Sequence, residues 1–173
     1  AKAIAAMADK FTSNGGDIKI ETVDTIRKTD AWHVNDNIGE NIVICAGPWS
    51  NDLLKPLGYK FPIAMKRGYH KHFQSDKNIS HALVDVDYGY LICPMEQGIR
   101  LTTGVEFASR GAKANPVQIA QIYPHAKDLI SLEGEIEDEA WLGARPCMAD
   151  SLPVIGQSKK QKGLWFNFGH GHD

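Results

Sequence analysis

The feature that most constrains the fold of this chain is a short apolar segment, Asn41–Ala46 (NIVICA), that is followed at once by glycine. A continuous run rich in β-branched residues is typical of a strand buried on both faces of a parallel sheet. Gly47-Pro48-Trp49-Ser50 then predicts a tight turn, and Asn51–Leu57 predicts a helix that ends at Gly58. A strand, a glycine turn and a helix in this order indicate an α/β arrangement of the nucleotide-binding kind.

The segments before this strand predict further short elements. Lys2–Ser13 carries apolar residues at helical spacing, so it predicts a helix with one buried face, which Asn14-Gly15-Gly16 ends. Asp17–Val23 predicts a strand, Asp24–Val34 a second strand or hairpin, and Asp36–Glu40 a turn.

From Phe61 onward the pattern changes to short strands separated by turns. The expected strands are Phe61–Phe73, Ala82–Val86, Tyr90–Pro94, Ile99–Val105, Trp141–Arg145, Val154–Ile155 and Leu164–Phe168. Asn115-Pro116 predicts the start of a helix that runs to about Ile122, and Pro124 predicts a break before a second helical piece. The fold class is therefore α/β or α+β, with domain boundaries expected near Tyr59 and Trp141.

Composition narrows the class of protein. The chain has 173 residues, 43% of them hydrophobic, which suits one globular domain or parts of two. A net charge of -2 argues against nucleic acid as a partner. No apolar run approaches the roughly 20 residues of a membrane span. The chain begins inside a predicted helix and ends within a Gly-His run, so we expect it to be a fragment truncated at both ends.

The three cysteines, Cys45, Cys93 and Cys147, are too widely spaced for a disulfide framework or a zinc site. Buried free thiols are the expectation, and they favour a reducing compartment.

Two segments carry residues suited to binding an anion. Gly47, at the end of the apolar strand, would aim backbone N–H groups at a phosphate or a nucleotide edge, although such turns also occur without a ligand. Lys66-Arg67-Gly68-Tyr69-His70 combines cations with an aromatic ring on a predicted strand. The alternative is an exposed strand face with tyrosine packed beneath it. His70, His72 and His81 lack a further ligand at useful spacing, so no metal is predicted.

Two more segments lie near the C-terminus. Arg145, in Gly143-Ala144-Arg145-Pro146, suits bidentate capture of a carboxylate, although a surface arginine would look the same. Gly169-His170-Gly171-His172-Asp173 predicts a loop whose backbone approaches a flat or charged ligand. A metal site there is disfavoured, because such a loop lacks a fixed cage.

Five stretches together resemble a known superfamily of flavoenzymes. They are NIVICAGPWSNDLLKPLG, FPIAMKRGYHKHF, YLICPMEQGIRLTTGVEFA, WLGARPCMADSLPVIG and LWFNFGHGHD. Their order and spacing resemble the FAD-dependent D-amino-acid, glycine and sarcosine oxidases, and most of all the bacterial D-amino-acid dehydrogenases. The resemblance implies a discontinuous FAD-binding domain, residues 1–58 and 141–173, around a substrate domain with a mixed sheet and helices on one face, residues 59–140.

The resemblance also implies roles for individual residues. Arg145 falls where the family binds the substrate carboxylate, and Tyr90 falls near an active-site aromatic residue. Arg67 and His70 match a stretch of the substrate site. The positions that match FAD-binding segments are Val23, Ala46, Gly47, Trp49, Gly169, His170, Gly171, His172 and Asp173.

The implied function is oxidation of the CH–NH bond of an amino acid, expected to be a D-amino acid, to an imino acid with FAD as cofactor. A glycine or sarcosine oxidase and a non-catalytic binding module of the same fold remain alternatives. The family's glycine-rich GxGxxG fingerprint is absent from this sequence, so we expect the fragment alone to bind FAD weakly or not at all. The resemblance implies a cytoplasmic protein and is compatible with a peripheral contact to the inner membrane, where a quinone or another electron acceptor would be met. The oligomeric state stays open.

Overall fold

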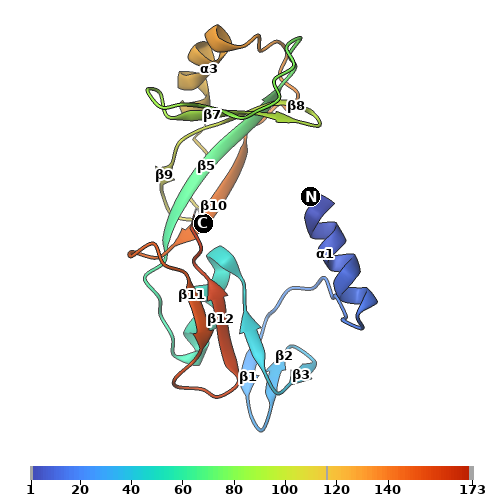
Figure 1. The fold of residues 1–173 in the computed structure, drawn as a ribbon. Coiled ribbons are helices and arrows are strands. Elements are labelled where there is room, and N and C mark those ends of the chain that lie inside the picture. The colour runs from blue at the N-terminus through green and yellow to red at the C-terminus, as the bar shows by residue number, and fades with distance from the viewer. Residues whose placement is uncertain (1, 116, 172–173) are drawn as a thin grey trace. The chain divides into compact units, whose positions relative to one another are not determined.

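The computed structural model describes residues 2–115 and 117–171, which divide into two compact units, Ala1–Glu40 and Asn41–Asp173. Figure 1 shows the elements of both units. The expected fold class is confirmed, because a few helices combine with three separate sheets in the described part of the chain. The domain boundaries expected near Tyr59 and Trp141 stay a prediction.

The first unit contains a helix and a three-stranded antiparallel sheet. Helix α1 (Lys2–Ser13) confirms the expected helix, but none of its described residues is buried, so the predicted buried face is wrong. The strands are β1 (Ile26–Lys28), β2 (Trp32–Val34) and β3 (Asn37–Gly39). The hairpin expected within Asp24–Val34 is confirmed, whereas strand β3 replaces the turn expected at Asp36–Glu40.

The strand expected at Asp17–Val23 is not formed, and the side chain of Asn35 binds the backbone where this segment ends. Its side-chain oxygen accepts the N–H groups of Asp24 at 3.0 Å and Thr25 at 3.2 Å, and its amide donates to the carbonyl of Thr22 at 2.8 Å. One side chain thereby satisfies backbone groups that a neighbouring strand would otherwise pair. Asn35 itself has φ 49°, which asparagine tolerates in a two-residue hairpin turn.

The second unit is built on a six-stranded sheet in the order β10-β5-β8-β7-β6, with β9 paired to β5. Its strands are β5 (Ala64–Phe73), β6 (Leu83–Asp85), β7 (Tyr90–Met95), β8 (Gly98–Thr102), β9 (Glu106–Phe107) and β10 (Trp141–Cys147). All pairings of this sheet among the described residues are antiparallel, whereas the sequence predicted a mixed sheet. The Glu96-Gln97-Gly98 hairpin between β7 and β8 is confirmed.

Helix α3 (Val117–Leu129) covers one face of this sheet (Figure 1), as expected for the substrate domain. The core between helix and sheet contains Phe73, Tyr90, Ile92, Ile99, Leu101, Ile122, Ala126, Ile130 and Leu132. The predicted break at Pro124 is wrong, because the helix continues through it. Burial of Ile122 and Ala126 on either side of the proline offsets the roughly 3 kcal/mol that a proline costs inside a helix.

A smaller sheet in the same unit joins β4 (Ile42–Ile44), β12 (Leu164–Phe168) and β11 (Val154–Gln157). Strand β12 lies parallel to β4 and antiparallel to β11. One face is buried and includes Ile44, Leu164, Phe166 and Phe168. Val43, Ile155 and Trp165 share the other face, and all are exposed, so the prediction that β4 is buried on both faces is wrong.

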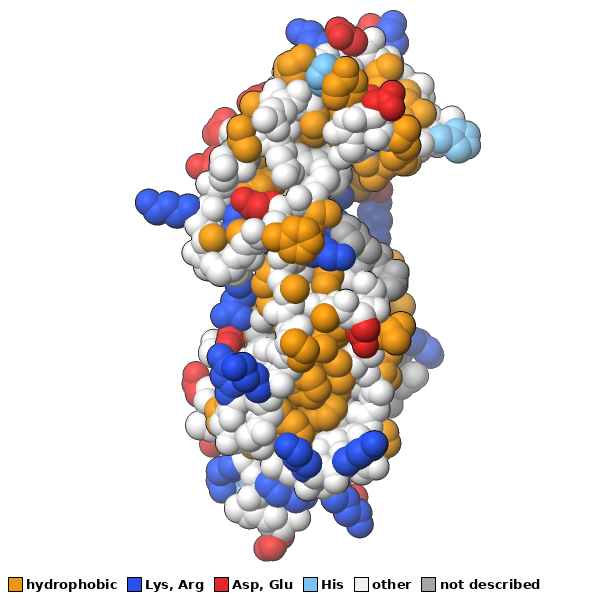
Figure 2. All heavy atoms as spheres, turned by 90° about the vertical axis from the view of Figure 1, so that its left-hand side faces the viewer, with side chains coloured by type: hydrophobic (Ala, Val, Ile, Leu, Met, Phe, Trp, Pro, Cys, Tyr) orange, Lys and Arg blue, Asp and Glu red, His pale blue; other side chains and the backbone are white. Residues whose placement is uncertain are grey.

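The turn after β4 forms as expected. It consists of η1 (Gly47–Trp49), α2 (Ser50–Leu54) and η2 (Lys55–Leu57), and it ends at Gly58, whose φ of 82° is the left-handed conformation predicted for a terminating glycine. The cysteines follow the prediction of buried thiols only in part: Cys147 is buried, Cys93 is half-buried and Cys45 is exposed. Figure 2 shows that apolar side chains also gather at the surface of the molecule.

Candidate functional site

The two faces of the six-stranded sheet differ sharply in chemistry. Paired residues of an antiparallel sheet point their side chains to the same face. The register of β10 against β5 pairs Trp141 with His70, Gly143 with Gly68 and Arg145 with Lys66. We call these six residues the open face. The other face carries the core beneath α3.

Arg145 lies on the open face with an exposed side chain. Lys66 is its direct cross-strand neighbour, so two cations share one small area. Two cations this close together favour the binding of an anion beside them. A hollow of about 110 Å³ adjoins Arg145 and is otherwise lined by Gly68, Trp141, Gly143 and Ala144. The arrangement suits a small carboxylate.

The Gly-His loop lies beside the end of the strand that carries Arg145. His170 forms a β-bridge with Cys147, and the N–H of Gly171 donates to the carbonyl of Pro146 at 2.9 Å. The backbone conformation favours glycine at both positions, because Gly169 has φ 82° and Gly171 has φ 67°. In addition, a Cβ on Gly171 would lie 3.1 Å from the Cys147 sulfur. The loop is thus held against β10, one to two residues from Arg145. His172 and Asp173 lie outside the described residues.

The turn that follows β4 is at the same edge. Strands β4 and β12 are parallel, so Ala46 and Gly47 leave β4 where Gly169 leaves β12. Element η1 also contacts β10. Gly47 has φ 50° and open space where a side chain would be, and Trp49 is exposed. Ligands of open α/β sheets bind at the carboxyl ends of the strands, and this edge offers that setting.

These features fit part of an FAD site. A bare glycine backbone at Gly47, together with the exposed ring of Trp49, can line the edge of a nucleotide, and the Gly169–Gly171 backbone can pass along a flat ring. The helix N-terminus and glycine-rich turn that usually hold the pyrophosphate are not in this sequence. Val23 lies half-buried in an extended segment of the first unit, and its role stays a prediction.

Arg67 is fully buried on the face opposite to Arg145. Its Nε donates to Glu106 at 2.9 Å, and its two terminal nitrogens donate to the Tyr69 hydroxyl and to three backbone carbonyls, those of Ser109, Ala112 and Lys113. A guanidinium has five N–H donors, and five acceptors surround it here. No donor is left for a substrate, so the expectation that Arg67 binds one directly is not met.

The loop that Arg67 holds reaches the glycine turn. Arg110, within that loop, donates to the carbonyl of Pro48 at 2.9 Å and to the Asp52 carboxylate at 2.7 Å, and its guanidinium lies 5.3 Å from the centre of the Trp49 ring. Arg67 therefore holds a loop that contacts the glycine turn, and it makes no direct contact with the open face.

Tyr90 belongs to the core beneath α3. The pairing of β5 with β8 and of β8 with β7 places Leu91 on the same face as His70, so Tyr90 points the opposite way. Burial, together with the Asp85 carboxylate, raises the pKa of Tyr90 to about 12. The expectation that Tyr90 is a catalytic residue disagrees with this placement in the core.

His70 remains on the open face with Arg145. Its ring stacks on Trp141 with centroids 4.6 Å apart, and burial, with further contributions from Arg100 and His72, lowers its pKa to about 4. The ring is therefore neutral at neutral pH. Sequence reasoning missed Trp141, although the period-two pattern Trp141-x-Gly143-x-Arg145 places all three on one strand face.

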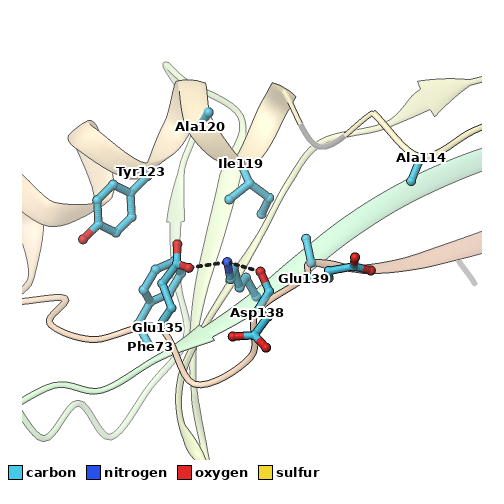
Figure 3. A pocket seen from close by; sticks show the side chains of 10 residues that line it. Phe73, Ala114, Ile119, Ala120, Tyr123, Glu135, Asp138 and Glu139 are labelled. Atoms are coloured by element: carbon cyan, nitrogen blue, oxygen red, sulfur yellow. Dashed lines mark hydrogen bonds and ion pairs between the residues drawn. The ribbon is translucent and has the colours of Figure 1, made fainter.

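A further pocket lies elsewhere, between α3 and the segment before β10 (Figure 3). It measures about 620 Å³ and includes Phe73, Ile119 and Tyr123. Lys71 is the cation among its described lining residues, and its ammonium already donates to Glu135 at 2.5 Å and to the carbonyl of Asp138 at 3.0 Å. A substrate carboxylate would compete with Glu135 there, which makes this pocket a poorer candidate than the hollow beside Arg145.

Comparison with known proteins agrees with this fold. The family model described as FAD dependent oxidoreductase (DAO) matches residues 1–173, and the chain belongs to this family. A D-amino acid dehydrogenase of Paramagnetospirillum magneticum is 30% identical over 136 residues, 76% of this chain and 32% of that protein. A glycine oxidase of Pseudomonas putida is 28% identical over 132 residues, 76% of this chain and 36% of that protein.

Solved structures show the same fold. Glycine oxidase from Geobacillus kaustophilus superposes with a TM-score of 0.71 at 20% identity, covering 87% of this chain and 42% of that one. Iminodiacetate oxidase from Chelativorans superposes with a TM-score of 0.77 at 18% identity, covering 96% and 48%. The chain spans about a third of the length of the curated relatives it matches.

Two features are absent from the described residues. No helix within residues 2–115 and 117–171 is long and apolar enough to cross a membrane. Those residues also contain no group of three or more His, Cys, Asp or Glu side chains placed to hold a metal ion.

Proposed function

We propose that the protein carrying this chain oxidises the CH–NH bond of an amino acid, with a D-amino acid as the expected substrate. The observation that carries the proposal is the meeting of three separate segments in one unit: Arg145 on β10, the Gly169–Gly171 loop against the end of β10, and the Gly47–Trp49 turn that contacts β10. A carboxylate-binding cation thus lies beside two backbone segments suited to a flat cofactor.

In this proposal each segment has a task. Arg145 binds the substrate carboxylate through charge-assisted hydrogen bonds, which are worth about 1.5–3 kcal/mol. Lys66 adds positive charge beside it. The glycine backbones of the turn and the loop line the cofactor, and anchoring the carboxylate orients the substrate Cα toward it. FAD, when bound between these segments, would supply the redox chemistry as the acceptor of a hydride equivalent from the substrate.

Two other activities fit the same site. Glycine and sarcosine oxidases would use Arg145 in the same way, and the identities of 30% and 28% to a dehydrogenase and an oxidase do not separate them. A binding module that has lost its flavin is the non-enzymatic alternative. The proposed electron acceptor is a quinone or another acceptor met at the inner membrane by an otherwise cytoplasmic protein.

The test uses the complete protein that carries this chain. Purified under air and then made anaerobic, it should show flavin absorbance that bleaches on addition of D-amino acids and much more slowly with L-enantiomers. Faster bleaching by glycine or sarcosine than by larger D-amino acids would instead support the oxidase alternative. A preparation without flavin that cannot be reconstituted with FAD would support the binding module and contradict the proposal.

A second measurement concerns residues 1–173 alone. We expect them to bind FAD weakly or not at all, because the pyrophosphate lacks its helix N-terminus. Titration of this polypeptide with FAD, followed by flavin fluorescence, checks the expectation. Stoichiometric yellow cofactor after purification would contradict it.

A further inference from the structure

The indole of Trp141 lies flat along its own strand. A Cβ built on Gly143 would lie 2.3 Å from the Trp141 Cη2 atom and 2.4 Å from Cζ3. The ring therefore occupies the space above Gly143, two residues along β10 in the direction of Arg145. Only glycine at 143 leaves room for this position.

One side of the indole is supported. His70 stacks on it with an interplanar angle of 24°. Behind His70, the buried ring of His72 accepts a hydrogen bond from Arg100 at 3.0 Å and pairs with Glu137 at 2.5 Å. The His72 ring, held by these bonds, packs edge-on against His70 with centroids 5.3 Å apart, and His70 in turn fixes the plane of the indole.

The rest of the indole is open. Trp141 is 59% exposed although it is packed against His70 and Gly143. Between the ring and Arg145 the hollow is lined by Gly68, Gly143 and Ala144, so no side chain larger than a methyl group intervenes. Two residues of strand separate Gly143 from Arg145, roughly 6–7 Å, which is close to the reach of one amino-acid substrate.

We propose that Trp141 is a specificity-determining residue, whose indole forms the wall against which the side chain of the substrate lies. The proposal rests on the proposed function, since it takes Arg145 as the carboxylate anchor. With the carboxylate at Arg145, a long apolar or aromatic side chain reaches the indole, while the methyl of alanine does not. The indole also carries no charge, so it favours apolar side chains over amides of similar size. The substrate class is D-amino acids with large apolar side chains.

The test compares kcat/KM for D-phenylalanine, D-leucine and D-alanine in the complete flavin-loaded protein. For Trp141→Ala, the values for phenylalanine and leucine should fall roughly 10-fold or more relative to alanine, as expected for the loss of an apolar contact. Trp141→Phe should keep most of the wild-type preference, measured as kcat/KM for D-phenylalanine or D-leucine divided by kcat/KM for D-alanine. Gly143→Ala should reduce the same preference although the indole is still present, because the new Cβ displaces the ring. Trp165→Ala, an exposed tryptophan on the other sheet, serves as the matched control.

Two outcomes for Trp141→Ala would overturn the proposal. An equal loss for all three substrates would show that Trp141 has only a structural role, and an unchanged ratio would show that the indole does not meet the substrate. Failure of the proposed function looks different, because then the wild-type protein itself would not oxidise any of the three. Flavin content measured for every variant separates a change in selectivity from a loss of fold.

Discussion

The two faces of the six-stranded sheet use the same strands for opposite purposes. Toward α3, the strands present Phe73, Ile92 and Leu101, all nearly inaccessible to solvent. Away from α3, they present glycine, one exposed tryptophan and an exposed arginine beside a lysine. Because successive residues alternate between faces, one face can carry the stability of the unit while the other is free to bind a ligand. Mutations on the two faces should therefore separate stability from activity.

The largest effect is expected for Arg67→Ala on the buried face. This change leaves the half-buried Glu106 and three backbone carbonyls without their partner, and each buried polar group left unpaired costs about 1–3 kcal/mol, so a total of several kcal/mol is expected. Urea denaturation measures the loss. Lys66→Ala, its neighbour on the open face, is the control and should change the free energy of unfolding by less than about 0.5 kcal/mol. Equal effects of the two would break the distinction between the faces.

The next effect is expected for Leu101→Ala. Leu101 is fully buried beneath α3, and such truncations cost about 2–5 kcal/mol because they leave a cavity. Thermal unfolding should show a lower Tm, while KM for amino acids in the remaining folded protein stays close to wild type. A changed KM with unchanged Tm would mean that this face belongs to the substrate site.

A smaller effect is expected for Gly171→Ala in the loop beside β10. The backbone at this position has φ 67°, and the added methyl would lie 3.1 Å from the Cys147 sulfur. The left-handed conformation alone costs a non-glycine residue about 1–2 kcal/mol. The complete protein should bind FAD several-fold more weakly, as measured by fluorescence titration, with its Tm lowered only slightly. Gly111→Ala, where a Cβ would have open space, is the control.

The last effect concerns pH and is absent at neutral pH. The pKa of His70 is about 4 in the folded chain, mainly because of burial, against 6.5 in the unfolded chain. The unfolded chain therefore binds more protons between these values, so stability is complete above pH 6.5 and falls as the pH drops toward 4. Burial raises the pKa of Glu137, but hydrogen bonds from His72 outweigh it and lower that pKa, which adds a loss only at lower pH. Replacing His70 with Asn should flatten the pH dependence of Tm between pH 4 and 6.5. An unchanged slope would contradict the assignment.

Many of the helices, strands and turns could be predicted from the local pattern of the sequence. The helix at Lys2–Ser13, the strand and glycine turn at Asn41–Gly58 and most strands after Phe61 follow from periodicity and turn residues. The predictions that were wrong concern segments whose structure depends on residues distant in the sequence. The backbone at Thr22–Thr25 pairs with the Asn35 side chain instead of a strand, and packing against the sheet carried α3 through Pro124.

The candidate site shows the same limit. Arg145 and the Gly-His loop could be selected from residue type and resemblance, and the structure brings them together. Arg67 and Tyr90 could not be excluded from sequence, because the face on which each lies depends on the register of three strands. The role proposed for Trp141 depends on the strand register and on the position of its ring above Gly143, neither of which follows from the sequence alone.

The measurement that tests the account most directly is the KM of the complete protein for its amino-acid substrate after Arg145→Ala. We expect KM to rise roughly 10- to 100-fold, because the carboxylate loses its charge-assisted hydrogen bonds, while the Tm changes little. The KM of Arg145→Lys should lie between that of wild type and that of Arg145→Ala, since lysine keeps the charge and loses the bidentate geometry. An unchanged KM in Arg145→Ala would contradict the assignment of the open face as the substrate site.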